Sequence, residues 1–251
     1  MRRSQQSGFT LIEIAIVLVI IGLLLGGVLK GQELITSARV RNLISQQDGI
    51  KAAFFGFQDR FRAYAGDYAS AYNTLKCPTG ASCLNGNGNG IIQNNAVPAT
   101  IAGVASEVHE EILAWMHLAS AGFLNGSYTM TAGDALFNDN NNPKNPYNIY
   151  LQIIYDNNYA DTAGAPSPKH NLKTGAQVPV EIIAEVDRKI DDGNGLRGGF
   201  RYSVYQGNAP AAPPAPNDTP SPTTCLGATG AQAGIWHIPQ GTTNCGGASL
   251  F

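Results

Sequence analysis

The strongest pattern along the chain is an apolar run over residues 9–29, FTLIEIAIVLVIIGLLLGGVL, in which Glu13 is the only charged residue. As an α-helix this run extends about 32 Å, close to the hydrocarbon thickness of a bilayer. Arg2 and Arg3 precede the run, and flanking basic residues favour the cytoplasmic side of a membrane. The pattern therefore predicts a transmembrane helix over 9–30, with the remainder of the chain on the outer side.

The helical pattern continues over residues 31–66 but changes there from uniformly apolar to amphipathic. The apolar positions recur at 4-3-4-3 spacing, on one helical face: Ile50, Phe54, Phe57, Phe61 and Tyr64. We expect this stripe to pack a globular head onto the helix rather than to hold a cofactor. Gly66 is the expected stop, since a left-handed glycine commonly follows a helix end.

Residues 67–251 predict an α+β head, in which a small antiparallel sheet lies against the long helix together with extra helices and loops. One helix is expected over 106–121, with Ser106 as its N-cap. A second is expected over 180–191, where the preceding proline suits the first turn of a helix.

Strands are predicted where apolar residues recur in period 2, at 147–155, 200–205 and 234–238. Residues 67–105 have no such pattern and are expected to be rich in loops. The segment 209–223 is rich in proline and is expected to be an extended loop.

Composition narrows the function without identifying it. Charged residues make up 14% of the 251 positions, and the formal net charge is −2. A chain with this balance has no broad basic surface for nucleic acid, so no nucleic-acid partner is indicated. The length is sufficient for one domain of ordinary size or two small ones.

The most specific motif lies where the polar leader meets the apolar run. After the short basic segment MRRSQQSG, the chain continues with FTLIE, so that the junction from Gly8 to Glu13 is GFTLIE. This junction resembles the N-terminus of type IV prepilins and type II secretion pseudopilins. An ordinary secretory signal is the alternative, but its apolar region would be only about 7–15 residues long. Residues 26–30 are also a poor match to its small-residue cleavage site.

The resemblance implies a processing reaction at this junction. A prepilin peptidase and methyltransferase would remove the leader, residues 1–8, by cutting between Gly8 and Phe9, and would methylate the new amine of Phe9. That amine is largely cationic at neutral pH, and opposite charges removed from water are tolerated when they are paired. We therefore expect Glu13 of one subunit to pair with the Phe9 amine of a neighbour and so to set the register of assembly.

By the same resemblance, the chain is expected to be a structural subunit of a type IV pilus or type II secretion pseudopilus, more specifically a minor pilin or pseudopilin, and not an enzyme. Its partners would be the processing enzyme, other pilin or pseudopilin subunits and an inner-membrane assembly platform. It would first lie in the bacterial inner membrane with an extracytoplasmic head, and later in a periplasmic pseudopilus or a surface pilus. The alternative is a membrane-anchored binding module or enzyme that never enters a filament.

The four cysteines would meet an oxidising compartment on the outer side of the membrane. Four cysteines permit three pairings, of which the local pairs Cys77–Cys83 and Cys225–Cys245 are favoured; unpaired buried thiols are the alternative. The resemblance implies that the second pair closes the C-terminal loop, as in many pilins. Neither pair has the CxxC spacing of a zinc or thioredoxin-type site.

Motifs of catalysis are incomplete in this sequence. The segment HEEIL, which begins at His109, lacks the second histidine of HExxH, and no G-x-S-x-G occurs. The sequence matches GxGxxG at 193–198, but this match follows a predicted helix and precedes a predicted strand. That order is the reverse of a dinucleotide-binding context, so we interpret the match as a turn.

Calcium is the one cofactor that the sequence suggests. Hard oxygen ligands gather around Gly193, contributed by Asp187, Asp191, Asp192 and Asn194. Calcium sites also occur in the C-terminal loops of some secretion pseudopilins, and the alternative is an acidic helix end before a glycine-rich turn. A second stretch, 85–90, has the spacing of a calcium loop, but asparagine replaces aspartate there and Ala96 stands where an EF-hand has glutamate.

Overall fold

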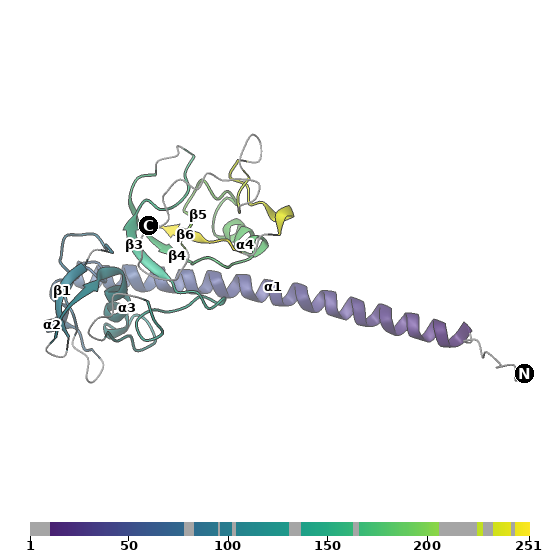
Figure 1. Cartoon of the computed structure of the whole chain (residues 1–251), viewed down its shortest axis with the longest axis horizontal. Coiled ribbons are helices and arrows are strands. Elements are labelled where there is room, and N and C mark those ends of the chain that lie inside the picture. The colour runs from purple at the N-terminus through teal and green to yellow at the C-terminus, as the bar shows by residue number, and fades with distance from the viewer. Residues whose placement is uncertain are drawn as a thin grey trace, which may run out of the picture. The chain divides into compact units, whose positions relative to one another are not determined.

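A computed structural model describes residues 11–77, 83–94, 96–101, 104–130, 137–162, 166–205, 225–227, 233–241 and 244–251 (Figure 1). The chain divides into two compact units, Met1–Arg39 and Val40–Phe251. Helix α1, Leu11–Phe61, contributes residues to both units. The leader, the Gly8–Phe9 junction and the proline-rich segment 209–223 lie outside the described residues.

In the second unit, α1 is buried along one face. The predicted stripe is confirmed as core, since Ile50, Phe54 and Phe57 are at most 5% exposed and the other two members, Phe61 and Tyr64, pack against the same cluster. This face meets apolar residues of α3, Glu110–Ser120, and of the sheet. An aliphatic and aromatic stripe of this spacing folds as a helix because only the helical period collects its members on one side.

The end of α1 differs from the prediction. The helix ends at Phe61, five residues before the expected stop at Gly66. The Arg62 N–H donates to the Gln58 carbonyl (2.8 Å), and Arg62 takes the left-handed conformation itself, with φ 55°. Gly66 is also left-handed, but a Cβ there would lie 2.4 Å from the Glu110 carbonyl oxygen. Gly66 therefore permits close approach to α3 instead of ending α1.

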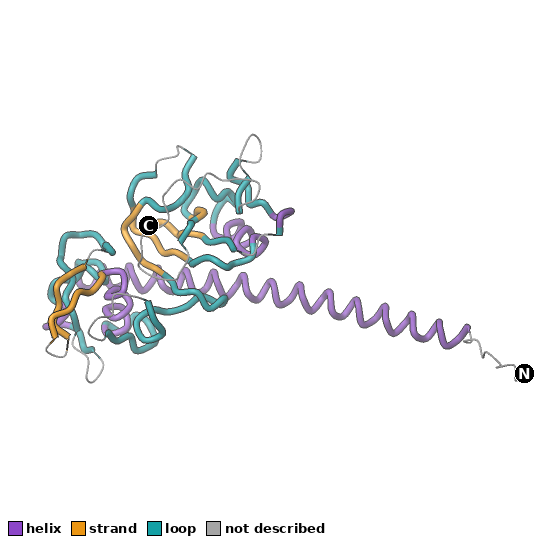
Figure 2. Tube along the Cα trace, viewed as in Figure 1, coloured by secondary structure: helices purple, strands orange, loops and turns teal. Residues whose placement is uncertain are grey.

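The main sheet has four strands, which are among the orange segments of Figure 2. Every neighbouring pair of these strands is antiparallel. Its order is β3-β4-β6-β5, made by β3 Gln152–Asp156, β4 Lys169–Lys173, β6 Gly247–Leu250 and β5 Phe200–Tyr202. The register pairs Ile153 with Leu172, and Ser249 with both Leu172 and Phe200. Ser249 also donates a hydrogen bond to Gln47 of α1 (3.0 Å), which ties the last strand to the long helix. The predicted α+β class is confirmed.

A β-hairpin precedes α3, and the sequence did not predict it. Strand β1, Ala96–Ile101, pairs with β2, Val104–His109, so the predicted N-cap Ser106 lies within a strand opposite Ala99. The prediction of a helix over 106–121 was therefore wrong at its start, because pairing with β1 satisfies the backbone of these residues before α3 begins. The helix ends as predicted, before a left-handed Gly122.

The other elements confirm some predictions and correct others. Helix α4, Val180–Ile190, follows Pro179 as predicted, and a short helix α2, Ala71–Thr74, lies within the expected loop region. The strand predicted over 147–155 begins only at Gln152, because the Asn145 side chain accepts the N–H groups of Tyr147 (2.8 Å) and Ile149 (3.1 Å) in a turn.

Two further strand predictions were too long. The strand over 200–205 stops at Tyr202. Residues 234–238 form only isolated bridges, of Ile235 with Asn194 and of Trp236 with Leu226. The chain then turns into the 3₁₀ helix η2, Ile238–Gln240, whose proline has no N–H for a sheet ladder.

Candidate functional site

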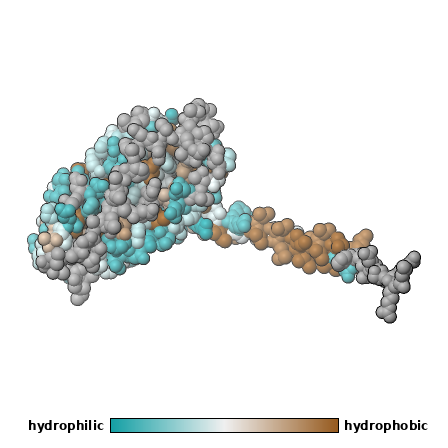
Figure 3. All heavy atoms as spheres, in the orientation of Figure 1, coloured by the Kyte–Doolittle hydropathy of each residue, from teal (hydrophilic) through white to brown (hydrophobic). Residues whose placement is uncertain are grey.

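The first candidate site is the apolar part of α1 in the first unit. Its large hydrophobic side chains between Leu11 and Leu29 are 45–89% exposed, and Figure 3 shows this part of the helix as a hydrophobic surface. The helix is long and apolar enough to cross a membrane. Burial in lipid or among similar helices removes this apolar surface from water, and either environment is compatible with a backbone whose hydrogen bonds are all internal.

Glu13 lies in the first turn of α1, among these exposed apolar residues. A carboxylate there costs roughly 2.5–3.5 kcal/mol if it reaches a bilayer centre, and less near an interface. The positive end of the helix dipole stabilises it in part. Gly8 and Phe9, between which cleavage is predicted, lie outside the described residues. The predicted pairing of Glu13 with the Phe9 amine of a neighbouring subunit therefore stays a prediction.

The second candidate site is the acidic cluster at the end of α4. One carboxylate oxygen from each of Asp187, Asp191 and Asp192 lies within 4.8 Å of the others. Asp187 is fully buried; its Oδ2 accepts the indole N–H of Trp236 (2.5 Å), and its Oδ1 is buried without a hydrogen-bond partner in the described part of the chain. Burial raises the pKa of Asp187 to about 6. The hydrogen bond from Trp236 lowers this pKa, whereas the negative charges of Asp192 and Asp191 raise it further.

Hydrogen bonds within the turn account for the rest of the predicted metal set. Asp191 Oδ2 accepts the N–H groups of Gly199 and Phe200, the second at 3.0 Å. Asp192 Oδ1 accepts the Asn194 N–H (2.8 Å), and Asn194 Oδ1 accepts the Leu196 N–H (3.0 Å). The structure thus brings the three aspartates together, while the Asn194 amide oxygen shapes the turn. The GxGxxG match is this turn between α4 and β5, as predicted.

The glycine- and asparagine-rich stretch over 85–90 is held by two buried acids. Asp67 accepts the N–H groups of Asn89 (2.9 Å) and Gly90 (2.8 Å), and Glu110 accepts that of Asn87 (2.9 Å). Burial raises the pKa of both carboxyl groups. The N–H groups of the loop point at the carboxylates, which explains why a segment with almost no apolar side chains keeps a defined path.

The comparisons with known proteins address the first site. The prokaryotic N-terminal methylation motif matches residues 3–29, which include the junction and most of the exposed apolar helix. This match supports a type IV pilin-like or pseudopilin-like protein. No curated protein and no solved structure matches it significantly. The motif implies processing by a prepilin peptidase and assembly with other pilin subunits, and it favours a structural subunit over an enzyme. The apolar helix fits a membrane-anchored pilin.

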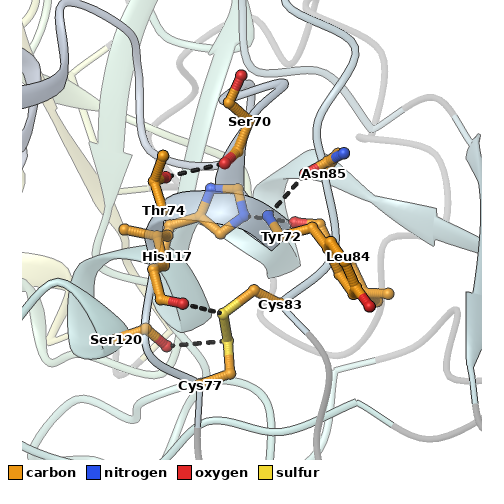
Figure 4. The surroundings of a disulfide bond; sticks show 10 residues. Ser70, Tyr72, Thr74, Cys77, Cys83, Leu84, Asn85, His117 and Ser120 are labelled. Atoms are coloured by element: carbon orange, nitrogen blue, oxygen red, sulfur yellow. Dashed lines mark hydrogen bonds between the residues drawn. A yellow bond between two sulfur atoms is a disulfide. The ribbon is translucent and has the colours of Figure 1, made fainter.

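Two disulfides stabilise the head of this pilin-like protein, and both are the local pairs that the cysteine spacing favours. Cys77–Cys83 lies against α3, where the Ser120 hydroxyl is 3.3 Å from Cys77 Sγ (Figure 4). Cys225–Cys245 closes the C-terminal segment just before β6, and Cys245 also exchanges backbone hydrogen bonds with Val178. The second bond therefore holds the last strand in its place beside the residues that begin α4.

Buried His117 of α3 joins the segments on either side of the first disulfide (Figure 4). Its Nδ1 accepts the Gly66 N–H (2.9 Å), so Nε2 carries the proton and donates to the Leu84 carbonyl (2.8 Å). Burial lowers the pKa of His117 to about 4, with the Leu84 contact opposing that effect. The neutral ring is thus a donor on one side and an acceptor on the other.

We expect the contribution of His117 to stability to disappear in acid. The histidine of the unfolded chain, with the ordinary pKa of 6.5, binds a proton that the folded protein takes up only near its lowered pKa of about 4. Wild type therefore loses about 3 kcal/mol relative to a non-titrating His117→Gln variant as pH falls from 6.5 to 4. Urea unfolding of both proteins across this range measures the difference. A gap between the two proteins that does not change with pH would contradict the buried neutral histidine.

Proposed function

We propose that this protein is a structural subunit of a type IV pilus or a type II secretion pseudopilus. It is cleaved between Gly8 and Phe9, methylated on Phe9 and assembled through the apolar part of α1. Before assembly it lies in the bacterial inner membrane with its head on the outer side, and an assembly platform in that membrane transfers it to the filament. The size and loop content of the head favour a minor pilin or pseudopilin.

The observation that carries this proposal is the coincidence of the methylation motif with an exposed apolar helix. A membrane anchor alone needs the apolar residues but not the junction that a peptidase recognises. The head itself has its own core and two disulfides, and none of the described residues of the apolar segment is among the residues of that core. The segment is thus available to pack among other copies of similar helices.

Glu13 supplies the register of this assembly. In a bundle of staggered helices its carboxylate lies beside the methylated amine of Phe9 on a neighbouring subunit. The two charges are stable in the apolar bundle only as a pair, whereas contacts between apolar side chains are equally good in many registers. The ion pair therefore selects one axial offset, and the apolar side chains provide most of the association energy.

Immunogold labelling of sheared fibres, with antibodies against the head, tests whether the protein enters a filament. We expect label on pili, or on pseudopili when the secretion system is overproduced, and the remaining protein in the inner-membrane fraction. Protein found only in the membrane, under conditions where other subunits form fibres, would instead support the anchored binding module or enzyme.

We also propose that the acidic cluster at the end of α4 binds calcium. Support comes from three carboxylates whose oxygens lie within 4.8 Å of one another, and from the buried Asp187 Oδ1, which has no hydrogen-bond partner among the described residues. A divalent cation would offset the repulsion that contributes to the raised pKa of Asp187. Calcium accepts 6–8 oxygen ligands in flexible geometry, so backbone carbonyls and water would complete the site.

Thermal unfolding with and without calcium tests this second proposal. Millimolar calcium is expected to raise the Tm of chelator-treated protein by roughly 2–5 °C, as for a site with sub-millimolar affinity. Asp192→Asn is expected to remove most of the shift, while Asp59→Asn, at an exposed position on α1, retains it. An unchanged Tm in wild type, or an equal shift in Asp192→Asn, would count against calcium binding here.

A further inference from the structure

A lysine, an aspartate and a glutamate are buried together where α3 meets β3 and β4. Lys173 is 1% exposed, Glu111 is fully buried, and the side chain of Asp156 is 12% exposed. Lys173 Nζ contacts Asp156 Oδ2. Glu111 Oε2 accepts a hydrogen bond from Gln152 Nε2 (2.5 Å), and Gln152 lies opposite Lys173 in the β3–β4 pairing. The three ionisable groups therefore share one space from which water is largely excluded.

The Asp156 carboxyl group is held with its two oxygens in different roles. Oδ1 accepts hydrogen bonds from the Asn171 side chain (2.9 Å) and from the Asn158 N–H (3.2 Å). Oδ2 faces the Lys173 amine and the Asn158 side chain, which is 3.0 Å away. Donors fixed at Oδ1 stabilise negative charge that develops there when a nucleophile adds to Cγ. The amine is already in contact with the carboxyl group, so little entropy is lost on approach.

Burial also favours the uncharged forms of these groups. Burial lowers the pKa of Lys173, although the negative charges of Asp156 and Glu111 raise it. Burial also raises the pKa of Glu111 to about 7. An ammonium–carboxylate pair and an amine–carboxylic acid pair differ only by one proton shifted along the contact. Exclusion of water raises the free energy of the ammonium–carboxylate form relative to the amine–carboxylic acid form, because only the ionic form loses strong hydration.

We propose that Lys173 and Asp156 condense to an intramolecular amide bond that joins β4 to β3. The ammonium group transfers one proton to Oδ2, the free amine adds to Cγ, and the nitrogen–carbon bond forms. The Cγ–Oδ2 bond breaks, and Oδ2 leaves as water with two of the lysine protons. The third proton remains on the amide nitrogen, and Oδ1 becomes the amide carbonyl oxygen. The reaction needs no oxidant, reductant or cofactor.

The surroundings suit the product as well as the reactants. The amide is neutral, so its formation removes a buried ion pair, which commonly contributes little net stability once desolvation is counted. The Asn158 and Asn171 donors remain usable by the amide oxygen. The aromatic ring of Tyr205 lies 5.9 Å from Lys173 Nζ and covers the amine on one side. The new bond closes the segment between Asp156 and Lys173 into a covalent loop.

The exposed pair Lys144–Asp139 is a natural control within the same head. Lys144 Nζ and Asp139 Oδ1 are 2.5 Å apart, so this amine and carboxylate are in contact, as those of Lys173 and Asp156 are. The Asp139 side chain, however, is 75% exposed and strongly hydrated, and no condensation is expected. Lys144→Arg therefore changes an ion pair of similar geometry without touching the buried space.

Intact-mass spectrometry of the reduced and denatured full chain tests the proposal. We expect wild type to be lighter than its sequence mass, corrected for processing, by one water molecule, and digestion to release a branched peptide containing Asp156 and Lys173. Lys173→Arg is expected to have the full mass, and Lys144→Arg to show the same loss as wild type. A folded wild-type protein of full mass overturns the proposal. So does a water loss that maps elsewhere, for example to a cyclic imide at Asp192–Gly193.

Discussion

Glu13→Ala is expected to reduce incorporation into filaments at least tenfold, while cleavage after Gly8 and insertion into the membrane continue. The variant leaves the methylated amine of Phe9 without its partner in an apolar bundle. Removing one member of a buried pair typically costs about 3–5 kcal/mol, and a factor of ten in an equilibrium constant needs only about 1.4 kcal/mol. The ratio of protein in sheared fibres to protein in membranes, measured by immunoblot, gives the effect directly.

Glu33 provides the matched control for this experiment. It lies on the same helix, where its exposed side chain forms an ion pair with Lys30 (2.7 Å), outside the apolar run. Glu33→Ala removes the same functional group but leaves no buried charge without a partner. The loss of an exposed ion pair costs at most about 1 kcal/mol, so this variant is expected to enter filaments nearly as well as wild type. Equal incorporation of Glu13→Ala and wild type would remove the proposed role of Glu13 in register.

Phe57→Ala is expected to lower the free energy of unfolding of the head by about 3–5 kcal/mol. Phe57 is fully buried. The centroid of its ring lies 4.6–6.3 Å from the ring centroids of four other residues, Phe61, Tyr68, His117 and Phe123. Alanine would leave a cavity where α1, α3 and the intervening loop meet. For a unit of this size the Tm should fall by roughly 10 °C, measurable by circular dichroism of the full chain in detergent.

Phe55, two residues earlier, distinguishes lost packing from altered helix propensity. Its side chain is 48% exposed. Phe55→Ala makes the same change in the same helix but removes much less buried surface, and it is expected to cost at most about 1 kcal/mol. Similar losses for the two variants would mean that the buried stripe of α1 does not hold the head together.

The elements predictable from sequence are those in which a periodic apolar pattern decides the structure by itself. The stripe that includes Phe54 and Phe57 fits only a helix, and α4 has an equally clear period. The junction at Gly8 was also recognisable, because six consecutive residues form the motif. The local disulfides followed from cysteines only 6 and 20 residues apart.

Strands β4 and β6 were not predicted, because their burial depends on distant partners. The β4 sequence KHNLK has one apolar residue, yet Asn171 and Lys173 are at most 1% exposed. Those polar groups are tolerated there because Asp156 on the neighbouring strand supplies their partners. Strand β6 is short and three of its four residues are small, and it forms because it pairs on both sides.

The same reason explains which parts of the candidate sites the sequence indicated. Asp187 and Asp191 are four residues apart near a helix end, so their proximity follows from helical geometry. Glu111, Asp156 and Lys173 come from three elements far apart along the chain, and no spacing predicts that they meet. The polarity of β4 was the available signal, since a lysine and an asparagine that become buried in a strand, here Lys173 and Asn171, require buried partners.

The N-terminal peptide of the protein isolated from its native cells gives the most direct test of the proposed assembly. Mass spectrometry is expected to find a chain that begins at Phe9 with a methylated α-amine. A mature protein that still carries MRRSQQSG would contradict this proposal, because an uncleaved leader leaves no free amine for the Glu13 of a neighbouring subunit.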